Sequence, residues 1–304
     1  NAIGPYRLLL DRPDLGGRIE RAVVFGHPTL SRQVAGLLAR DDVEVVVVCP
    51  GGRSWPDAAR RATTVAAAVT MDGGRDADHG WLAEWQEAGG RARTVLDGVL
   101  DASAISGPLV AREVAAAGGQ LVIGSSNAVR DMDLAGVPAD GEIPLVVANR
   151  GLAGIDGTVS TATGVALASG TFTRVLLGDL TLLHDIGGLL IGPLEDRPQL
   201  QIVVINDDGG GIFALLEHGA PEHAAVFERV FGTPHGADIA ALCAGFGVSH
   251  TLVNDLADLR KALADPPEGR SVVEVEVDRS GHRGLHARIR AALAAADHKP
   301  PPFP

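Results

Sequence analysis

Two apolar, β-branched runs in the second half of the chain constrain its fold more than any other feature. Residues 174–177 lead into Gly178-Asp179-Leu180, and residues 201–205 lead into Asn206-Asp207-Asp208-Gly209. Such runs predict buried strands, and the segment 182–190 between them predicts a crossover helix. Strands joined in this way are parallel and end at the same edge of their sheet. We therefore expect an α/β protein with both acidic clusters side by side at the edge where open α/β sheets bind ligands.

The chemistry of these clusters predicts a metal and phosphate site. Carboxylate, amide and backbone oxygens suit a hard cation such as Mg²⁺, which also takes phosphate oxygens from its ligand. The glycines at positions 209–211 carry no Cβ that would keep a diphosphate away from the backbone. Gly178-Asp179 alone is common at strand ends in any α/β protein. A second acidic cluster at the end of another parallel strand favours the site.

Composition excludes several classes of protein. A chain of 304 residues forms one or two domains, and a formal net charge of −12 argues against a nucleic-acid partner. No apolar run is long enough to span a bilayer. Cys49 and Cys243 are too few and too scattered for a disulfide framework or a zinc site. We expect both to be reduced in a cytoplasmic protein. The chain opens on Asn1 without a methionine, which suggests a piece of something longer.

The pattern of elements predicts two domains. Residues 1–80 alternate strands and helices in a Rossmann-like way, but they contain neither glycine-rich nucleotide motif, so we interpret them as scaffold. The polar, glycine-rich segment 71–78 is the best linker candidate. Residues 81–304 form the second domain. The elements expected there are helices at 81–88, 95–103, 108–117, 158–169, 239–246, 256–264 and 283–296, and strands at 120–123, 144–148, 251–253 and 271–277, besides the two central runs.

A second informative segment is Asn149-Arg150-Gly151-Leu152-Ala153-Gly154-Ile155-Asp156-Gly157, which precedes a helix rich in Ser and Thr. Its glycines at three-residue spacing permit a tight, backbone-rich loop at a sheet edge. From the residues alone, this segment is equally a plain strand-to-helix turn or part of a ligand site.

The motifs together resemble those of known enzymes. A Gly-Asp pair followed some two dozen residues later by an Asn pair or a close variant is similar to the signature of thiamine-diphosphate (ThDP) enzymes. The segment 149–157 and the sequence Gly210-Gly211-Ile212-Phe213 resemble the 2-succinyl-5-enolpyruvyl-6-hydroxy-3-cyclohexene-1-carboxylate (SEPHCHC) synthases of menaquinone biosynthesis. Residues 26–32 resemble, more loosely, a substrate-facing loop of that family. The resemblance implies a ThDP-type diphosphate-binding fold preceded by part of a middle domain.

The resemblance also implies roles for matching positions. The metal ligands, for Mg²⁺ or Mn²⁺, would be the Asp179 and Asp207 side chains and the Gly209 carbonyl. Asp207 stands where the family usually has Asn, which adds negative charge beside a diphosphate. The other implied cofactor-binding positions are Ser126, Asp156, Gly157, Leu180, Thr181, Asn206, Gly210 and Gly211. Ile155 would hold the cofactor bent, while Ile212 and Phe213 would wall the reaction centre.

The implied substrates are 2-oxoglutarate and isochorismate, which together carry several carboxylates. Arg32, Arg130 and Arg150 would bind them, and arginine suits that task because its planar fork binds carboxylate bidentately. We expect Arg130 and Arg150 in loops that leave adjacent strands. The implied enzyme is a transferase that decarboxylates 2-oxoglutarate and adds the resulting succinyl-semialdehyde unit to isochorismate.

One expected residue is missing from these motifs. The family uses a glutamate that hydrogen-bonds the cofactor's aminopyrimidine, and it lies in a preceding pyrimidine-binding domain. The resemblance implies a homodimer or homotetramer with active sites at the dimer interface, and an inactive fragment in residues 1–304 alone. Two alternatives stay open: another ThDP-dependent 2-oxoacid enzyme, such as one like acetolactate synthase, and a non-catalytic diphosphate-binding module.

Overall fold

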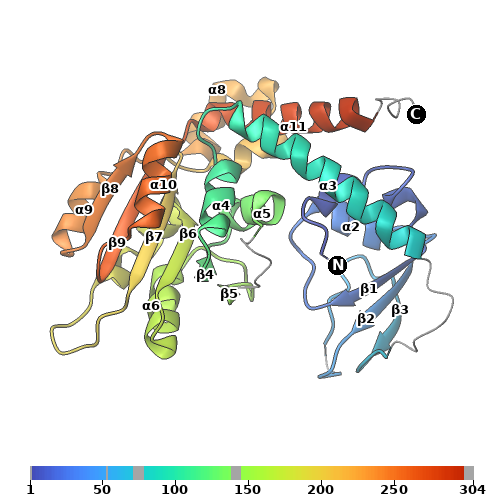
Figure 1. The fold of residues 1–304 in the computed structure, drawn as a ribbon, viewed down its shortest axis with the longest axis horizontal. Helices are drawn as coiled ribbons and strands as arrows, with labels where there is room; N and C mark the ends of the chain where they lie inside the picture. Colours follow the sequence, from blue (N-terminus) through green and yellow to red (C-terminus); the bar gives the residue numbers. More distant parts are fainter. Residues whose placement is uncertain (1, 53, 71–78, 138–144, 298–304) are drawn as a thin grey trace. The chain divides into compact units, whose positions relative to one another are not determined.

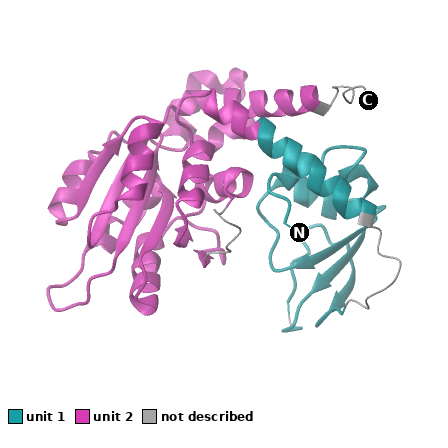
Figure 2. Cartoon of the chain, in the orientation of Figure 1, with its two compact units in different colours: residues 1–95 teal, residues 96–304 magenta. Residues whose placement is uncertain are grey.

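The computed structural model describes residues 2–52, 54–70, 79–137 and 145–297. The chain divides into two compact units, residues 1–95 and residues 96–304 (Figure 2). Sequence reasoning placed the division near residue 80, at a linker, 71–78, that lies outside the described residues. The structural division instead falls within helix α3 (His79–Asp101).

The first unit is built on a three-stranded parallel sheet in the order β1-β2-β3 (Figure 1). Its core is made by Val24 of β1, by Val45 and Val47 of β2 and by Val43 just before β2, together with partly buried Leu37 and Leu38 of α2. Sequence reasoning expected the third strand of this unit at residues 65–69, whereas it begins three residues earlier, at Ala62. The elements before α3 are α1 (Tyr6–Leu9), β1 (Arg21–Phe25), α2 (Arg32–Leu38), β2 (Glu44–Val48) and β3 (Ala62–Ala66).

Helix α3 is continuous, which corrects the prediction of separate helices at 81–88 and 95–103. The gap between the two expected helices contains Gly89-Gly90, and glycine disfavours the helix interior by about 1 kcal/mol. The structure gives Gly89 a packing reason, since a Cβ at this position would lie 2.7 Å from Cγ2 of Ile3. Close contact of the chain's beginning with this helix thus requires a residue without a side chain.

The second unit contains a six-stranded sheet in the order β5-β4-β6-β7-β9-β8, in which every pairing is parallel (Figure 1). This order confirms the α/β class. In particular, β6 and β7 are direct neighbours, with Gly178 opposite Ile205. The strands are β4 (Gln120–Ile123), β5 (Val146–Ala148), β6 (Thr173–Gly178), β7 (Leu200–Asn206), β8 (Ser249–Val253) and β9 (Arg270–Glu276). Residue 144 of the expected strand 144–148 lies outside the described residues.

Helices cover both faces of this sheet and create two hydrophobic cores. One core joins inward side chains of the central strands to Val110 and Val114 of α4 and to Leu259 of α10. The other joins the opposite side chains to Val159 of α6 and Ile239 of α9. The helices are α4 (Gly107–Ala116), α5 (Asn127–Ala135), α6 (Thr158–Ser169), α7 (Asp179–His184), α8 (Ala224–Phe227), α9 (Ile239–Gly245), α10 (Leu256–Ala264) and α11 (His282–Asp297).

The expected crossover helix at 182–190 is shorter and begins earlier. The α-helix α7 starts at Asp179 itself and ends at His184, and a 3₁₀ turn, Ile186–Leu189, completes the crossover. Sequence reasoning expected a long polar insertion from residue 214 to about Asp238. Residues 211–232 instead fold into short helical turns around α8. Within the described residues, no helix has the length and apolar character needed to cross a membrane.

Strand order also defines where the chain reverses direction across the sheet. From β4 the chain passes outward to the edge strand β5 and then returns to β6 on the other side of β4. The carboxyl ends of strands flanking such a reversal form a crevice, which is where open α/β sheets bind ligands.

Candidate functional site

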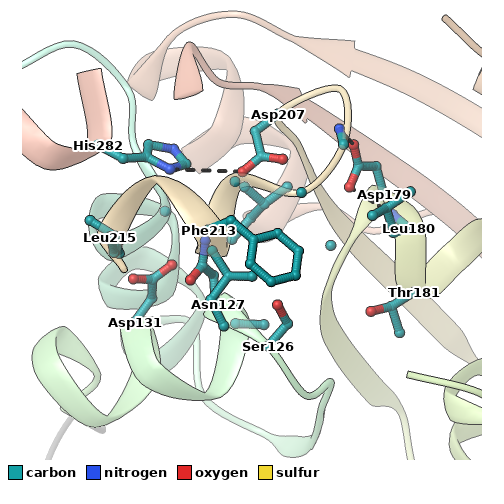
Figure 3. A pocket seen from close by; sticks show the side chains of 18 of the residues that line it. Ser126, Asn127, Asp131, Asp179, Leu180, Thr181, Asp207, Phe213, Leu215 and His282 are labelled. Carbon is teal, nitrogen blue, oxygen red and sulfur yellow. Dashed lines mark hydrogen bonds and ion pairs between the residues drawn. The ribbon is translucent and has the colours of Figure 1, made fainter. Parts of the chain in front are cut away.

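A cavity lies at this reversal, at the carboxyl ends of β4, β6 and β7 (Figure 3). The N-terminus of α4 and the start of α11 complete its wall, through Gly107, Pro108, His282 and Leu285. Many of the residues that the sequence singled out line it together: Ser126, Ile155, Asp179, Leu180, Thr181, Asp207, Gly209, Gly210, Gly211, Ile212 and Phe213.

Asp179 is the first residue of α7 and is almost completely buried, with 2% of its surface exposed. Its Oδ1 accepts a hydrogen bond from the Leu180 amide at 2.6 Å, and its Oδ2 accepts one from the Gly209 amide at 2.8 Å. The imidazole Nε2 of His235 lies 3.0 Å from the same Oδ2. Burial raises the pKa of Asp179 above its ordinary value, although these three donors act in the opposite direction.

Asp207 follows β7 and is buried in the same wall. Burial, and next to it the charge of Asp179, raise the pKa of Asp207 to about 7, against the opposing effect of Arg279. The Nδ1 atom of His282 lies 3.8 Å from Asp207 Oδ2 (Figure 3), beyond hydrogen-bond distance. Burial lowers the pKa of His282, which favours its neutral form, so it compensates the carboxylate little. The carboxyl groups of Asp179 and Asp207, which repel each other when both are charged, are therefore buried together in the wall of the cavity.

This donor set fits a divalent cation. A hard ion such as Mg²⁺ is bound by one or two carboxylates together with phosphate oxygens, and its charge would relieve the repulsion between Asp179 and Asp207. In the described parts of the chain, no three or more His, Cys, Asp or Glu side chains group as a metal site. The expected set instead combines these two carboxylates with the Gly209 carbonyl, so a bound ion would leave positions for ligand oxygens.

The glycine run beside these carboxylates is required by the protein itself. A Cβ at Gly209 would lie 2.0 Å from the carbonyl oxygen of Gly232, and one at Gly210 would lie 2.1 Å from that of Phe231. A Cβ at Gly211 would lie 1.8 Å from the carboxylate of Asp207. Sequence reasoning explained these glycines by the approach of a diphosphate. The structure adds the close packing of a distant chain segment and of Asp207.

The backbone after β7 is held in an uncommon conformation. Asp208 has a φ of 54°, in the left-handed region that non-glycine residues seldom adopt. Arg279 supports it, because its Nη1 donates to the carbonyl oxygens of both Asp207 and Asp208 at 2.6 Å. Hydrogen bonds from the amides of Gly236 and His235 to the side chain lower the pKa of Asp208. The loop is thus fixed from two sides.

Ser126, at the end of β4, has a φ of 67° and lies just before α5. Arg130 lies on helix α5 and not in a loop as expected. Its Nη1 donates to the Ser126 carbonyl at 2.6 Å. Arg150 follows the neighbouring strand β5, and its Nη1 lies 3.5 Å from Ser125 Oγ. Both guanidinium groups are half-buried beside residues 125–126, next to the cavity rather than in its lining.

Other predicted positions lie around the cavity. Asp156 is exposed and pairs with His184, while Gly157 has a φ of 69° and precedes α6. The Asn206 side chain donates to Glu274 at 2.6 Å and accepts from the Asp208 amide, so it braces the loop. Neither Asp156 nor Asn206 is among the residues that line the cavity. Arg32 is the first residue of α2 in the other unit, and its role stays a prediction.

Sequence reasoning missed several residues of this site. Asp131 and His282 line the cavity, and His235 contacts Asp179. His282 and His235 stand outside the quoted motifs, and His235 is 56 positions from Asp179. Asp131 directly follows Arg130, which the sequence analysis had singled out. Of these three missed residues, Asp131 is therefore the one that the sequence could have indicated.

Comparison with known proteins gives relatives over nearly the whole chain. The chain is 51% identical to a 2-succinyl-5-enolpyruvyl-6-hydroxy-3-cyclohexene-1-carboxylate synthase of Paenarthrobacter aurescens, in a match that covers 97% of this chain and 54% of that protein. A synthase of the same name from Kineococcus radiotolerans is 52% identical, with the same two shares. This chain is related to the SEPHCHC synthases. It spans about half the length of the curated relatives that it matches.

A further SEPHCHC synthase, from Saccharopolyspora erythraea, is 50% identical over 92% of this chain and 50% of that protein. No family model matches the chain. Among solved structures, a benzoylformate decarboxylase from Polynucleobacter necessarius is similar with a TM-score of 0.52 and 16% identity, over 86% of this chain and 49% of that one. At this identity the likeness concerns the fold alone, and it confirms the expected fold class.

Proposed function

We propose that this chain is the part of a ThDP- and Mg²⁺-dependent SEPHCHC synthase that holds the metal ion and the diphosphate of the cofactor. One observation carries the proposal. The two acidic clusters, the glycine run and the hydroxyls of Ser126 and Thr181 line a single cavity at the strand reversal. The kinship with the synthases supports the same assignment.

The proposal assigns work to the residues of this chain. Asp179, Asp207 and the Gly209 carbonyl would hold Mg²⁺ or Mn²⁺, and Ser126 and Thr181 would donate hydroxyl hydrogen bonds to diphosphate oxygens. When bound, ThDP supplies the electron sink for decarboxylating a 2-oxoacid.

Apolar side chains of the cavity would keep water from the reacting atoms. Ile155, Ile212 and Phe213 line it, and Phe213 packs against Phe231, with the ring centroids 5.6 Å apart. Water exclusion strengthens the electrostatic interactions between the wall and a bound anion.

The substrates would be 2-oxoglutarate and isochorismate, whose carboxylates need cationic partners. Arg130 and Arg150 are the candidates, because both lie beside residues 125–126 at the cavity rim. A guanidinium group keeps its charge in a dry site and binds carboxylate bidentately. Arg32 is proposed for the same role on the resemblance alone. The product would enter menaquinone biosynthesis.

The rest of the enzyme would complete the site. We assign the acid that contacts the aminopyrimidine to the part of the synthases that this chain does not span, and the working assembly to a homodimer or homotetramer. Residues 1–304 alone should therefore bind ThDP weakly at best and release no CO₂ from 2-oxoglutarate. The chain joined to the remaining half of a relative, here called the joined protein, should regain both ThDP binding and CO₂ release.

The decisive experiment is calorimetric titration of ThDP, in the presence of Mg²⁺, into the chain joined to the remaining half of a relative and into variants of this joined protein. Asp179→Ala should abolish binding because it removes a metal ligand, whereas Asp258→Ala, an exposed aspartate of α10, should bind as the parent does. Unchanged ThDP affinity in Asp179→Ala would refute the proposed site. If the joined protein releases CO₂ from pyruvate as fast as from 2-oxoglutarate, the assignment of 2-oxoglutarate as the substrate is refuted, while the assignment of ThDP as the cofactor stands.

A further inference from the structure

A distant segment of the second unit closes over the glycine run. Residues 231–237, here called the covering segment, contact the loop after β7 mainly through backbone atoms. The Gly210 amide donates to the Gly232 carbonyl at 2.7 Å. The amides of His235 and Gly236 donate to Asp208 Oδ1 at 3.0 and 2.9 Å. The covering segment therefore holds the same loop whose Gly209 carbonyl is a proposed metal ligand.

The side chain of His235 reaches past this loop to Asp179. The Ala237 amide donates to its Nδ1 at 2.9 Å, so Nδ1 acts as an acceptor and carries no proton. The proton of the neutral ring is therefore on Nε2, which donates to Asp179 Oδ2 at 3.0 Å. The covering segment's own backbone thus selects the tautomer that bonds the carboxylate.

Three donors then orient the Asp179 carboxylate. Oδ2 accepts from Gly209 and His235, and Oδ1 accepts from Leu180. A carboxylate offers about four lone-pair positions, so one position on Oδ1 stays available for a cation. The geometry leaves a single direction for metal binding rather than a freely rotating group. Outer hydrogen bonds of this kind orient ligands and tune metal affinity.

We propose that His235 is a positioning residue of the metal site, which fixes the Asp179 carboxylate through its Nε2–H and ties it to the covering segment. The inference rests on the proposed function, since it needs Asp179 to be a metal ligand. His235 itself would touch neither the cofactor nor a substrate. Its effect should appear in the affinity for the divalent cation.

The probe is Mn²⁺, whose binding to the joined protein in the presence of ThDP is followed by electron paramagnetic resonance. His235→Ala should weaken Mn²⁺ binding about tenfold to a hundredfold, the usual cost of losing an outer partner of a metal ligand. His235→Gln should restore most of it, because the amide places an N–H donor near the position of Nε2. The matched control is His223→Ala, which removes an exposed histidine of the same polar region and should bind as the parent does.

Each outcome decides the proposal. Equal Mn²⁺ affinity in His235→Ala, or equal losses in His235→Ala and His235→Gln, would overturn it. Tighter binding in His235→Ala would overturn it in favour of an imidazole that occupies the metal's place. If the joined protein without substitutions binds no Mn²⁺ with ThDP, the proposed function fails first, and Asp179→Ala serves as the reference for that result.

A measurement without cofactor guards against variants that do not fold. Nitrogen-15 spectra of the parent chain report which ring nitrogen of His235 carries the proton. The proposal requires protonated Nε2 and unprotonated Nδ1 in the neutral ring, and the opposite tautomer would refute it. In His235→Gln, the Gly209 amide, which donates to Asp179 Oδ2, should exchange its hydrogen no faster than in the parent chain.

Discussion

Replacing Asp207 with Asn should stabilise the metal-free protein at neutral and alkaline pH. The side chain is buried with 8% of its surface exposed, and burial and the charge of Asp179 raise its pKa from the ordinary 3.8 to about 7. At 1.36 kcal/mol per pH unit, this difference corresponds to about 4 kcal/mol. Asn keeps the shape of the side chain and removes the charge. The expected gain in the free energy of unfolding is therefore of that order.

The sign and the pH range follow from the direction of the pKa change. A carboxyl group with a raised pKa binds its proton more tightly in the folded state than in the unfolded chain. Its contribution to stability is fully present below pH 3.8 and is lost as the pH rises through about 7. Relative to the parent, Asp207→Asn should thus gain stability between about pH 4 and 7 and keep the gain above that range.

The assay is urea unfolding of both proteins across this pH range with a chelator present. Asp208→Asn is the matched control, because hydrogen bonds from Gly236 and His235 lower the pKa of Asp208, so its charge stabilises the fold above the ordinary pKa. That substitution should lose stability at neutral pH. A stability difference between Asp207→Asn and the parent that does not change with pH would refute the reasoning. Added Mg²⁺ with ThDP should shrink the difference.

Two further outcomes are expected. In the joined protein, Arg130→Ala and Arg150→Ala should each lower kcat/KM for 2-oxoglutarate at least tenfold, because each loses a charge-assisted pair worth about 2–5 kcal/mol. Steady-state kinetics measures this loss, and a ThDP affinity that differs between variant and parent would point to a structural role instead. Arg174→Leu should lower the free energy of unfolding by about 3 kcal/mol or more. Buried Arg174 donates to the carbonyls of Ala117, Gly118 and Leu263 and to Gln201, and these acceptors would lose their donor. Urea unfolding measures the change. The control is Arg91→Leu, which removes an exposed ion pair with Glu87 and should change stability by less than about 1 kcal/mol.

The sequence by itself determined the sheet and the meeting of the two acidic clusters. Runs of β-branched residues mark buried strands, and the crossover between the runs makes them parallel, so both acidic clusters come to the same edge of the sheet. The pairing of Gly178 with Ile205 agrees with this expectation. The same logic predicted that β4 and β5 are neighbours. These features depend on local pattern and on the limited ways in which strands connect.

Local pattern was insufficient where packing decided the conformation. The Gly89-Gly90 pair reads as a helix break, yet α3 runs through it, and Gly89 lies where a Cβ would clash with Ile3. Arg130 reads as a loop residue, yet Ser126 has a positive φ of 67° and α5 begins at the next position. Neither the clash at Gly89 nor the backbone angle at Ser126 is encoded in a local pattern.

Only the tertiary structure decided how the acidic site is supported. The contact of His235 with Asp179 joins residues 56 positions apart, through a segment of short turns with no regular hydrophobic pattern. The pKa of Asp207 likewise depends on its burial and on its nearness to Asp179, Arg279 and Asp131 in space. The sequence supplies the identity of such charged groups. Their interaction energies and pKa values depend on the distances between them and on the exclusion of solvent, which are set only when the chain folds.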